Sequence, residues 1–184
     1  GKHWIATYLG GLDCFDGKKF IHYRHDPDNE NSIADESIWE VFEDSRHNLW
    51  IGTLSAGLDR FERTKGIFYH FPPGMPQSVN GQRIEAIMED DEGNLWLGTD
   101  NGIDVLEKRS GRFIHYSYEE HNTGSLNTNT INYIMQDSQG LIWIGTAEGL
   151  HLFDRERNTF RVFRKKDGLP DNNVLTIVED GQHH

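Results

Sequence analysis

The sequence lacks several features that would point directly to a function or a location. Cys14 is the only cysteine in 184 residues, so an intrachain disulfide is excluded. No apolar run approaches the length that spans a bilayer, and we expect no direct membrane insertion of this segment. Phosphate-binding loops, nucleophile elbows, paired cysteines and HExxH motifs are also absent, so no motif points to an enzyme class.

Basic residues are scarce as well. Lys and Arg number 18 against 30 Asp and Glu, which gives a net charge of −12 at pH 7. Nucleic acids and anionic membrane surfaces bind through Lys and Arg, so neither is expected as a partner. Solubility is the simplest explanation of the acidic balance. In contrast, aromatic residues reach 11% and glycines number 19, which suits strands joined by tight turns.

A repeat centred on tryptophan accounts for the whole chain. Four tryptophans lie 46, 46 and 47 residues apart in nearly identical contexts, which are His3-Trp4-Ile5-Ala6-Thr7, Leu49-Trp50-Ile51-Gly52-Thr53, Leu95-Trp96-Leu97-Gly98-Thr99 and Ile142-Trp143-Ile144-Gly145-Thr146. After each one come a glycine turn, an alternating strand, a tight turn and a strand with paired aromatics. A polar loop (24–36, 72–82, 117–129, 164–172) then leads to a strand that is apolar on both faces, at 37–44, 83–90, 130–137 and 173–180.

Four short strands per repeat predict an all-β fold, a β-propeller with four blades of four antiparallel strands. We expect residues 1–184 to form a single propeller segment, with repeats at approximately 1–48, 49–94, 95–140 and 141–184. The doubly apolar strand should be innermost and the aromatic strand outermost. The segments are too short and too rich in β-branched residues for a helical repeat.

Ring closure remains open at this point. The chain begins at a Trp strand and ends at an inner strand, so 173–180 could complete the first blade or a blade of a neighbouring chain. The segment is part of a larger ring, half of an eight-bladed dimer, or a four-bladed ring.

Residues that recur in every repeat are expected to explain the fold. The histidines at equivalent outer-strand positions, His22, His70 and His115, should point away from one another, so no metal site and no cofactor are predicted. Turn-opening aspartates should bond their own backbone, at Asp44, Asp90, Asp137 and Asp180. The pair His183-His184 is interpreted as a turn or a tag remnant, and no catalytic residue is predicted.

Residues that differ between repeats are the candidates for ligand binding. They cluster at the start of the inner strands, and the set is Trp39, Arg83, Glu85, Asn132, Tyr133 and Asn173. An aromatic platform with charges and amides suits sugar recognition, by stacking and by hydrogen bonds to hydroxyls. Trp39 stands out because its counterparts Glu85, Asn132 and Leu175 are not aromatic. The alternative is that these side chains line a channel or a packed interface.

The repeated motif Leu-Trp-Ile-Gly-Thr, with Gly-Leu, Phe-Asp and a Gly-Asn turn, resembles the two-component regulator propeller repeat. The resemblance covers the whole chain, with good examples at 95–104 and 141–154, and the first repeat departs at Ala6. In that family the repeats form periplasmic sensor regions of hybrid two-component systems of gut anaerobes, which detect oligosaccharides. Their rings have about seven blades.

The resemblance implies a periplasmic, non-enzymatic sensor segment that recognises an oligosaccharide and signals to a kinase outside this chain. A second hypothesis is a structural or interaction propeller that dimerises. A propeller lyase or hydrolase is the third, because the fold alone does not determine function. The expected protein partner is a second copy of the chain or the neighbouring blades of a larger propeller.

Overall fold

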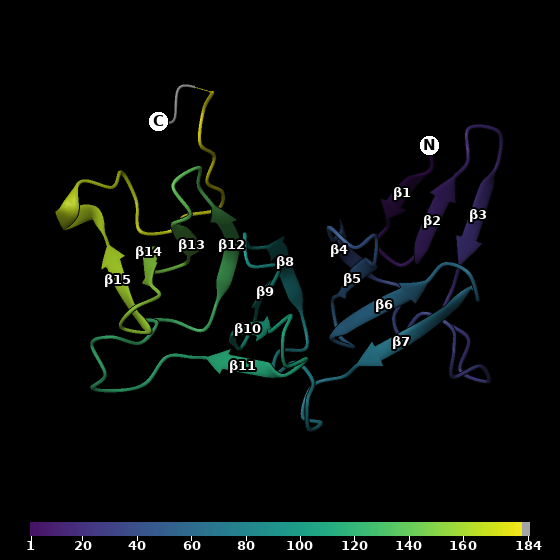
Figure 1. Ribbon diagram of the computed structural model, residues 1–184, viewed down its shortest axis with the longest axis horizontal. Coiled ribbons are helices and arrows are strands. Elements are labelled where there is room, and N and C mark those ends of the chain that lie inside the picture. The colour runs from purple at the N-terminus through teal and green to yellow at the C-terminus, as the bar shows by residue number, and fades with distance from the viewer. Residues whose placement is uncertain (182–184) are drawn as a thin grey trace. The chain divides into compact units, whose positions relative to one another are not determined.

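The computed structural model describes residues 1–181, in which strands alternate with turns and loops (Figure 1). A short 3-10 helix at Lys165–Asp167 is the one helical element of this described range. The expected all-β architecture with four sheets is confirmed. The pair His183-His184 lies outside the described residues. Within that range, no helix has both the length and the apolar character needed to cross a membrane.

The chain divides into two compact units, Gly1–Ile84 and Glu85–His184. The first sheet has the order β1-β2-β3, with bounds β1 His3–Ala6, β2 Leu12–Phe15 and β3 Phe20–Tyr23. The second sheet has the order β4-β5-β6-β7, with bounds β4 Ile38–Glu43, β5 Leu49–Thr53, β6 Leu58–Glu62 and β7 Ile67–Phe71.

The third sheet begins at the boundary between the units, and the fourth lies wholly in the second unit. The third has the order β8-β9-β10-β11, with bounds β8 Ile84–Glu89, β9 Leu95–Thr99, β10 Gly102–Leu106 and β11 Phe113–Tyr116. The fourth has the order β12-β13-β14-β15, with bounds β12 Ile131–Gln136, β13 Ile142–Thr146, β14 Gly149–Asp154 and β15 Thr159–Phe163. In each four-stranded sheet the doubly apolar strand is at one edge and the aromatic strand at the other, as predicted.

One strand prediction is wrong. Residues 173–180 form no strand, and within residues 1–181 the first sheet has three strands instead of the expected four. The physical reason lies in the pairing of the other sheets. Strands β4 and β12 pair with the Trp strand that follows them in sequence, and no such strand follows 173–180 within residues 1–181. The segment therefore lacks the ladder partner that would make it a strand.

Three of the four predicted turn-opening aspartates, Asp44, Asp90 and Asp137, bond their own backbone as expected, and each also binds a tryptophan. In the second sheet, Asp44 Oδ1 accepts from the Arg46 N–H at 2.9 Å, and Asp44 Oδ2 accepts from Trp50 Nε1 at 2.9 Å. Equivalent indole bonds are made by Trp96 to Asp90, at 2.9 Å, and by Trp143 to Asp137, at 2.8 Å. One carboxylate thus holds both the backbone of the turn and the indole ring of the following Trp strand.

Aromatic contacts join consecutive sheets within each unit. In the first unit the Trp4 ring packs edge-on against Phe61, with centroids 5.4 Å apart. In the second unit Trp96 packs in the same way against Phe153, at 5.1 Å. Such edge-to-face pairs add to the apolar burial that holds neighbouring blades together. The tryptophan of one blade therefore packs against the phenylalanine of the next.

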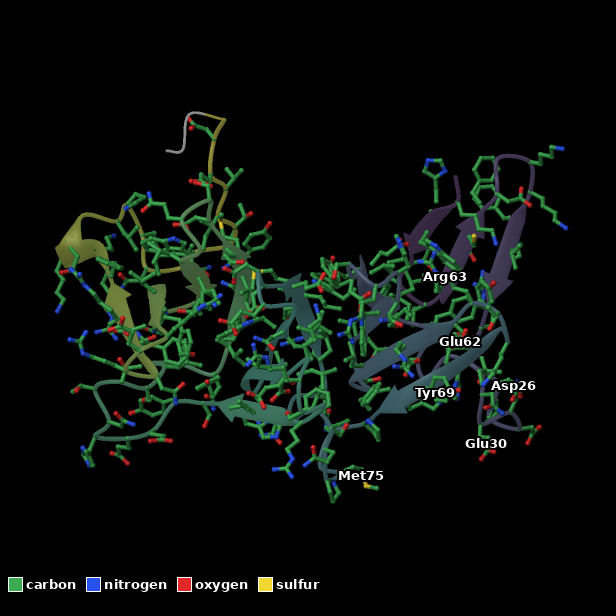
Figure 2. The ribbon with its side chains drawn as sticks, in the orientation of Figure 1. Asp26, Glu30, Glu62, Arg63, Tyr69 and Met75 are labelled. Atoms are coloured by element: carbon green, nitrogen blue, oxygen red, sulfur yellow. The ribbon has the colours of Figure 1, made fainter. Side chains whose placement is uncertain are left out.

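The loop between β3 and β4 also ties two blades of the first unit together. It carries Asp26 and Glu30 and runs beside the outer strand β7, which holds Tyr69 (Figure 2). The Glu30 carbonyl accepts from His70 Nε2 at 2.9 Å, and the Asn31 carbonyl accepts from the Phe68 N–H at 3.0 Å. Because these bonds are made by backbone carbonyls of the loop, the side chains of the loop can change while its backbone stays in position.

The glycines of the Trp strands β5 and β9 are required by the strands that cross them. A Cβ built on Gly98 would lie 2.7 Å from Ile131 Cγ2, and one on Gly52 would lie 2.9 Å from the Ile84 side chain. Both contacts are closer than carbon atoms can approach. The inner strand of the following blade therefore lies against the Trp strand at a distance that only glycine permits.

We predict that Gly98→Ala lowers the free energy of unfolding by about 1–3 kcal/mol, because the added methyl group overpacks the contact with Ile131. Urea denaturation followed by tryptophan fluorescence measures the change. Gly181→Ala is the matched control, since no atom lies within 4 Å of its Cβ position. Equal stability of the two variants would contradict the close approach.

Candidate functional site at the inner strands

The inner strands β4 and β12 each contain a β-bulge at the same position. In β4 the register shifts between Ile38 and Glu40, which leaves Trp39 without a cross-strand partner. In β12 the shift falls between Ile131 and Tyr133, so Asn132 is the extra residue. A bulge redirects the inserted side chain, and bulges are common next to functional sites. The predicted ligand residues of these strands therefore lie at structurally special positions.

Trp39 is the most exposed of the candidate aromatics. Its side chain is 55% exposed, whereas Trp50, on the neighbouring strand, is 4% exposed. The neighbouring Glu40 was not among the predicted residues. Burial raises the pKa of the Glu40 carboxyl, and a hydrogen bond to the Val41 backbone partly opposes that rise. A carboxylate with a perturbed pKa beside an exposed indole is a recognisable binding feature.

A signal for Glu40 was present in the sequence. The equivalent positions of the other repeats hold Ala86, Tyr133 and Thr176, so Glu40 is the charged member of a position that is otherwise uncharged. From this position Tyr133 was among the predicted ligand residues and Glu40 was not. Within β4 Glu40 lies between the apolar residues Trp39 and Val41, and a carboxylate in such a place is also a candidate functional residue.

In the second unit the structure joins two of the predicted residues. Asn132 Nδ2 donates to Asn173 Oδ1 at 3.1 Å and to the Val174 carbonyl at 2.9 Å. Tyr133 is half-buried on the same strand, and Asn173 is exposed. The two amides thus form a polar group at the start of β12, and Tyr133 follows Asn132 along the strand.

Arg83 and Glu85 flank the first residue of β8. Arg83 is exposed just before the strand, and Glu85 is half-buried within it. Both side chains take part in interactions within the fold. They lie on either side of the boundary between the two units, whereas Trp39 belongs to the first unit. Of the six predicted residues, Asn132 and Asn173 are the pair joined by the hydrogen bonds described here.

The repeated histidines bond to carboxylates of their own blades. His70 Nδ1 lies 2.6 Å from Asp59 Oδ1, and His115 Nδ1 lies 2.6 Å from Asp104 Oδ1. The Asp59 carboxylate raises the pKa of His70, against the opposing effect of burial. Among residues 1–181, no group of three or more potential ligands could hold a metal ion. Each His–Asp pair therefore links two adjacent strands of one sheet.

The fourth blade replaces this pair by a buried histidine. His151 occupies the position of Asp59 and Asp104, faces Val162 across the ladder and is fully buried. Its Nε2 accepts from the Asn127 N–H at 3.4 Å, as the Asp59 carboxylate accepts from Ala34. Burial, together with the charge of Arg164, lowers the pKa of His151 to about 4. The ring is therefore neutral at pH 7.

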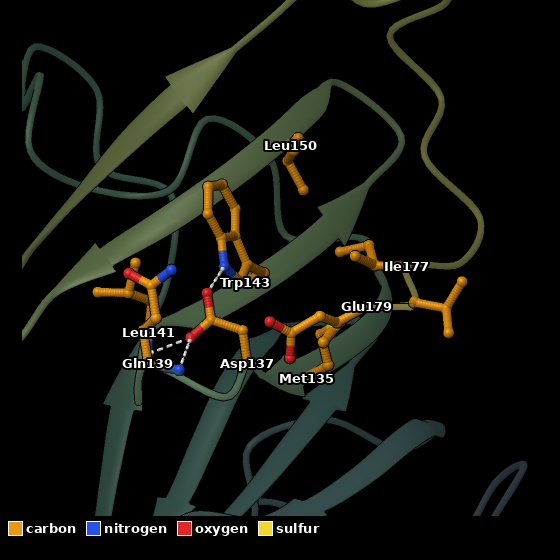
Figure 3. Close-up of a pocket in the computed structure, with 9 residues that line it drawn as sticks. Met135, Asp137, Gln139, Leu141, Trp143, Leu150, Ile177 and Glu179 are labelled. Atoms are coloured by element: carbon orange, nitrogen blue, oxygen red, sulfur yellow. Dashed lines mark hydrogen bonds between the residues drawn. The ribbon is translucent and has the colours of Figure 1, made fainter. Parts of the chain in front are cut away.

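A hollow of about 360 Å³ lies between the fourth sheet and the C-terminal segment (Figure 3). Trp143 and Leu150 line one side, and Ile177 and Glu179 come from the segment after the sheet. Asp137 lies at the edge, where Figure 3 shows its hydrogen bonds to the Trp143 indole and to its own turn. The hollow is mostly apolar, which suits packing better than recognition of a sugar.

Three segments of the chain match the family model described as two component regulator propeller, at residues 32–55, 78–101 and 125–148. The chain therefore carries two-component regulator propeller repeats. Each match begins at the serine before a buried loop residue and ends just after a Trp strand. No curated protein matches the chain.

Solved structures confirm the propeller fold. One is described as the extracellular domain of a hybrid two-component system, BT3049 of B. thetaiotaomicron, with 24% identity, a TM-score of 0.72, and coverage of 87% of this chain and 21% of that one. Another is described as the extracellular domain of a one-component system, BT4673 of the same organism, with 18% identity, a TM-score of 0.79, and coverage of 99% and 24%. The chain thus matches about a quarter or less of these larger propeller proteins.

An enzyme also has the same fold. Virginiamycin B lyase from Staphylococcus aureus matches with 16% identity and a TM-score of 0.64, over 89% of this chain and 52% of the lyase. At such identities the likeness extends to the fold and not to the chemistry.

We predict that His151 makes stability depend on pH. Its folded pKa of about 4 lies below the usual 6.5, so stability present above pH 6.5 is lost as the pH falls towards 4. The loss should reach about 3 kcal/mol, because between pH 6.5 and pH 4 the histidine binds a proton in the unfolded chain but stays neutral in the folded one. Urea denaturation at pH 7 and at acidic pH measures it.

The variant His151→Gln should show a smaller loss of stability over the same pH range. His121→Gln serves as the control, since the His121 side chain is 90% exposed and should not change the pH dependence. If the parent protein and His151→Gln lost stability equally, the assignment to His151 would be wrong.

Proposed function

Because the chain carries two-component regulator propeller repeats, we propose that it is a ligand-sensing segment of a receptor of the hybrid two-component class. In this proposal residues 1–184 form one continuous segment of a larger propeller, outside the cytoplasm, in the periplasm. The segment is not an enzyme, and it passes a conformational change to a kinase that lies outside this chain. Its ligand is an oligosaccharide.

The bulge that carries Trp39 beside Glu40 is the observation that supports a carbohydrate ligand best. An exposed indole offers a flat apolar face on which a sugar ring stacks. A carboxylate held next to it accepts hydrogen bonds from sugar hydroxyls. The indoles of Trp4 and Trp50, on the Trp strands of the same unit, instead pack against aromatic neighbours.

The polar group at the start of β12 supports the same class of ligand. Asn132 and Asn173 present amide donors and acceptors, and Tyr133 adds a hydroxyl on the same strand. Arg83 and Glu85 hold the corresponding place around β8. Neutral, multiply hydroxylated ligands are recognised by such sets of amides, carboxylates and aromatic faces.

Catalysis is the less favoured alternative. The similarity to virginiamycin B lyase is a likeness of fold at 16% identity, so it carries no catalytic residue to this chain. The hydrogen bonds of Asn132 to Asn173 and to the Val174 carbonyl join groups that suit the binding of hydroxyls.

We predict that Trp39→Ala weakens oligosaccharide binding by roughly five- to thirtyfold, since loss of the stacking face costs about 1–2 kcal/mol. Isothermal titration of the 184-residue chain against a panel of plant and host oligosaccharides identifies the ligand first. Glu40→Gln should weaken the same ligand by a smaller factor, because an amide still accepts a hydrogen bond.

Tyr118→Ala is the matched control, because its ring is 50% exposed but lies in the loop between β11 and β12. It should bind as the parent chain does. Absence of heat and of any fluorescence change across the panel would refute carbohydrate sensing by this segment. Chemical conversion of one of these oligosaccharides, with no stable complex formed, would instead favour the hypothesis of a lyase or hydrolase.

A further inference from the structure

One histidine of the first unit holds a loop on the second sheet through two hydrogen bonds. His70 on β7 lies between the Asp59 carboxylate of β6 and the backbone carbonyl of Glu30, in the loop between β3 and β4. Its Nδ1 lies 2.6 Å from Asp59 Oδ1, and its Nε2 lies 2.9 Å from the Glu30 oxygen. Asp59 is fully buried and the His70 side chain is 30% exposed, so the ring can exchange protons with solvent.

The two distances show how many protons this His–Asp pair holds. A carbonyl oxygen only accepts, so the Nε2 atom of His70 carries a hydrogen. The contact with Asp59 needs a second hydrogen, which belongs either to Nδ1 or to the carboxyl group. In both cases the pair has one proton more than a neutral imidazole beside a carboxylate. The hydrogen bond to Asp59 raises the pKa of His70, against the effect of burial, which favours a proton on the ring.

The two strands next to the loop present different charges to this ring. On β6 the Asp59 carboxylate contacts it directly. On β7 the neighbouring Tyr69 points to the opposite face of the sheet, because side chains alternate along a strand. There the Arg60 guanidinium lies over the Tyr69 ring, 5.0 Å from its centroid. The positive charge of Arg60 is therefore separated from His70 by the sheet itself.

The loop adds negative charge and a second histidine. Its exposed carboxylates favour the protonated form of the nearby imidazole, and they belong to Asp26, Asp28 and Glu30 (Figure 2). His25 Nδ1 donates to the Ile33 carbonyl at 2.9 Å. A neutral imidazole can make this bond as well as a charged one, so titration of His25 need not break it.

The part of the loop that contacts His70 is a compact turn. The Asp26 N–H donates to Ser32 Oγ at 2.9 Å, and the Ser32 N–H donates to the Asn29 carbonyl at 2.9 Å. The next residues are held independently, because Ile33 is fully buried and the Ala34 N–H donates to Asp59 Oδ2 at 2.8 Å. Residues 26–32 can therefore leave the sheet as one piece while the chain that follows stays in place.

The fourth sheet holds a similar loop without such a histidine. The Glu119 N–H donates to Ser125 Oγ at 3.1 Å, as Asp26 does to Ser32. The Phe160 N–H donates to the Gly124 carbonyl at 2.7 Å, which matches the bond from Phe68 to Asn31 in the second sheet. Val162 takes the position of His70. The backbone contact of this loop therefore has no imidazole beside it at that position.

We propose that His70 and Asp59 form a proton-dependent latch, which holds residues 26–32 on the second sheet and releases them when the pair loses its extra proton. Without that proton, Nδ1 keeps its hydrogen for the Asp59 carboxylate, and the lone pair of Nε2 faces the Glu30 oxygen. Two acceptors at this distance repel each other, so the carbonyl moves away.

The direction of the pH effect follows from the raised pKa of His70. The latch contributes its full stability below the usual histidine pKa of 6.5, and the contribution is lost as the pH rises through the raised value. A segment outside the cytoplasm meets the pH of its surroundings, and this consequence for sensing rests on the proposed function. The opening of the loop does not depend on it.

Hydrogen exchange of the 184-residue chain tests the latch. An NMR titration of the His70 imidazole first identifies one pH at which the ring is charged and one at which it is neutral. Between them the protection factor of the Phe68 amide should fall by about tenfold, because one hydrogen bond to a charged group is lost. The Phe160 amide is the internal control, and its protection factor should not change.

Two variants assign the effect to one ring. His70→Gln should abolish the pH dependence at the Phe68 amide, because a glutamine side chain does not titrate. His22→Gln is the matched control, since His22 is the equivalent histidine of the first sheet, with its Nδ1 2.8 Å from Asp13 Oδ1. It should leave the response at Phe68 as in the parent chain. Circular dichroism checks that both variants fold.

Several results would overturn the proposal. A His70 ring that is already neutral at about pH 6, or that stays charged until the chain unfolds, excludes control by its proton. Equal protection of the Phe68 amide at the two pH values shows that the loop does not depend on the pair, and an equal fall at Phe160 shows a general loosening. A response that persists in His70→Gln belongs to another group. These measurements use no carbohydrate, so they are independent of the titrations of Trp39→Ala.

Discussion

The close approach of each inner strand to the glycine of the preceding Trp strand is the contact on which the arrangement of blades depends. A Cβ at Gly52, Gly98 or Gly145 would lie within 3 Å of the following strand or segment. In the second unit this approach accompanies the edge contact of the Trp96 ring with Phe153. Ala6 takes the glycine's place in the first sheet and packs against the buried cluster that includes Ile38.

Much of the fold could be predicted from the repeats. The inner strands predicted at 37–44, 83–90 and 130–137 are observed one residue shorter at each end. The failure at 173–180 has a different cause. Its sequence is that of a strand, but a strand exists only when a neighbour satisfies its backbone, and periodicity along one segment contains no information about that neighbour.

The candidate site was harder to predict than the fold. Comparison of the repeats singled out Trp39 and Asn132 because they differ, but it gave no hint that both are inserted residues of a β-bulge. Glu40 could have been named as the charged member of its position, but the burial that raises the pKa of its carboxyl could not be predicted from the repeats. The His151 substitution shows the same limit, because a histidine in place of an aspartate acquires its meaning from the fully buried position. Packing, not residue type, decides these cases.

The bulge has a consequence for how such chains diversify. An inserted residue takes no part in the register of the ladder, so its side chain can change without disturbing the strands on either side. Equivalent positions in the four repeats hold a tryptophan, a glutamate, an asparagine and a leucine. In the second and fourth sheets the inserted position can therefore change from one residue type to another while the pairing of the flanking strand residues is kept.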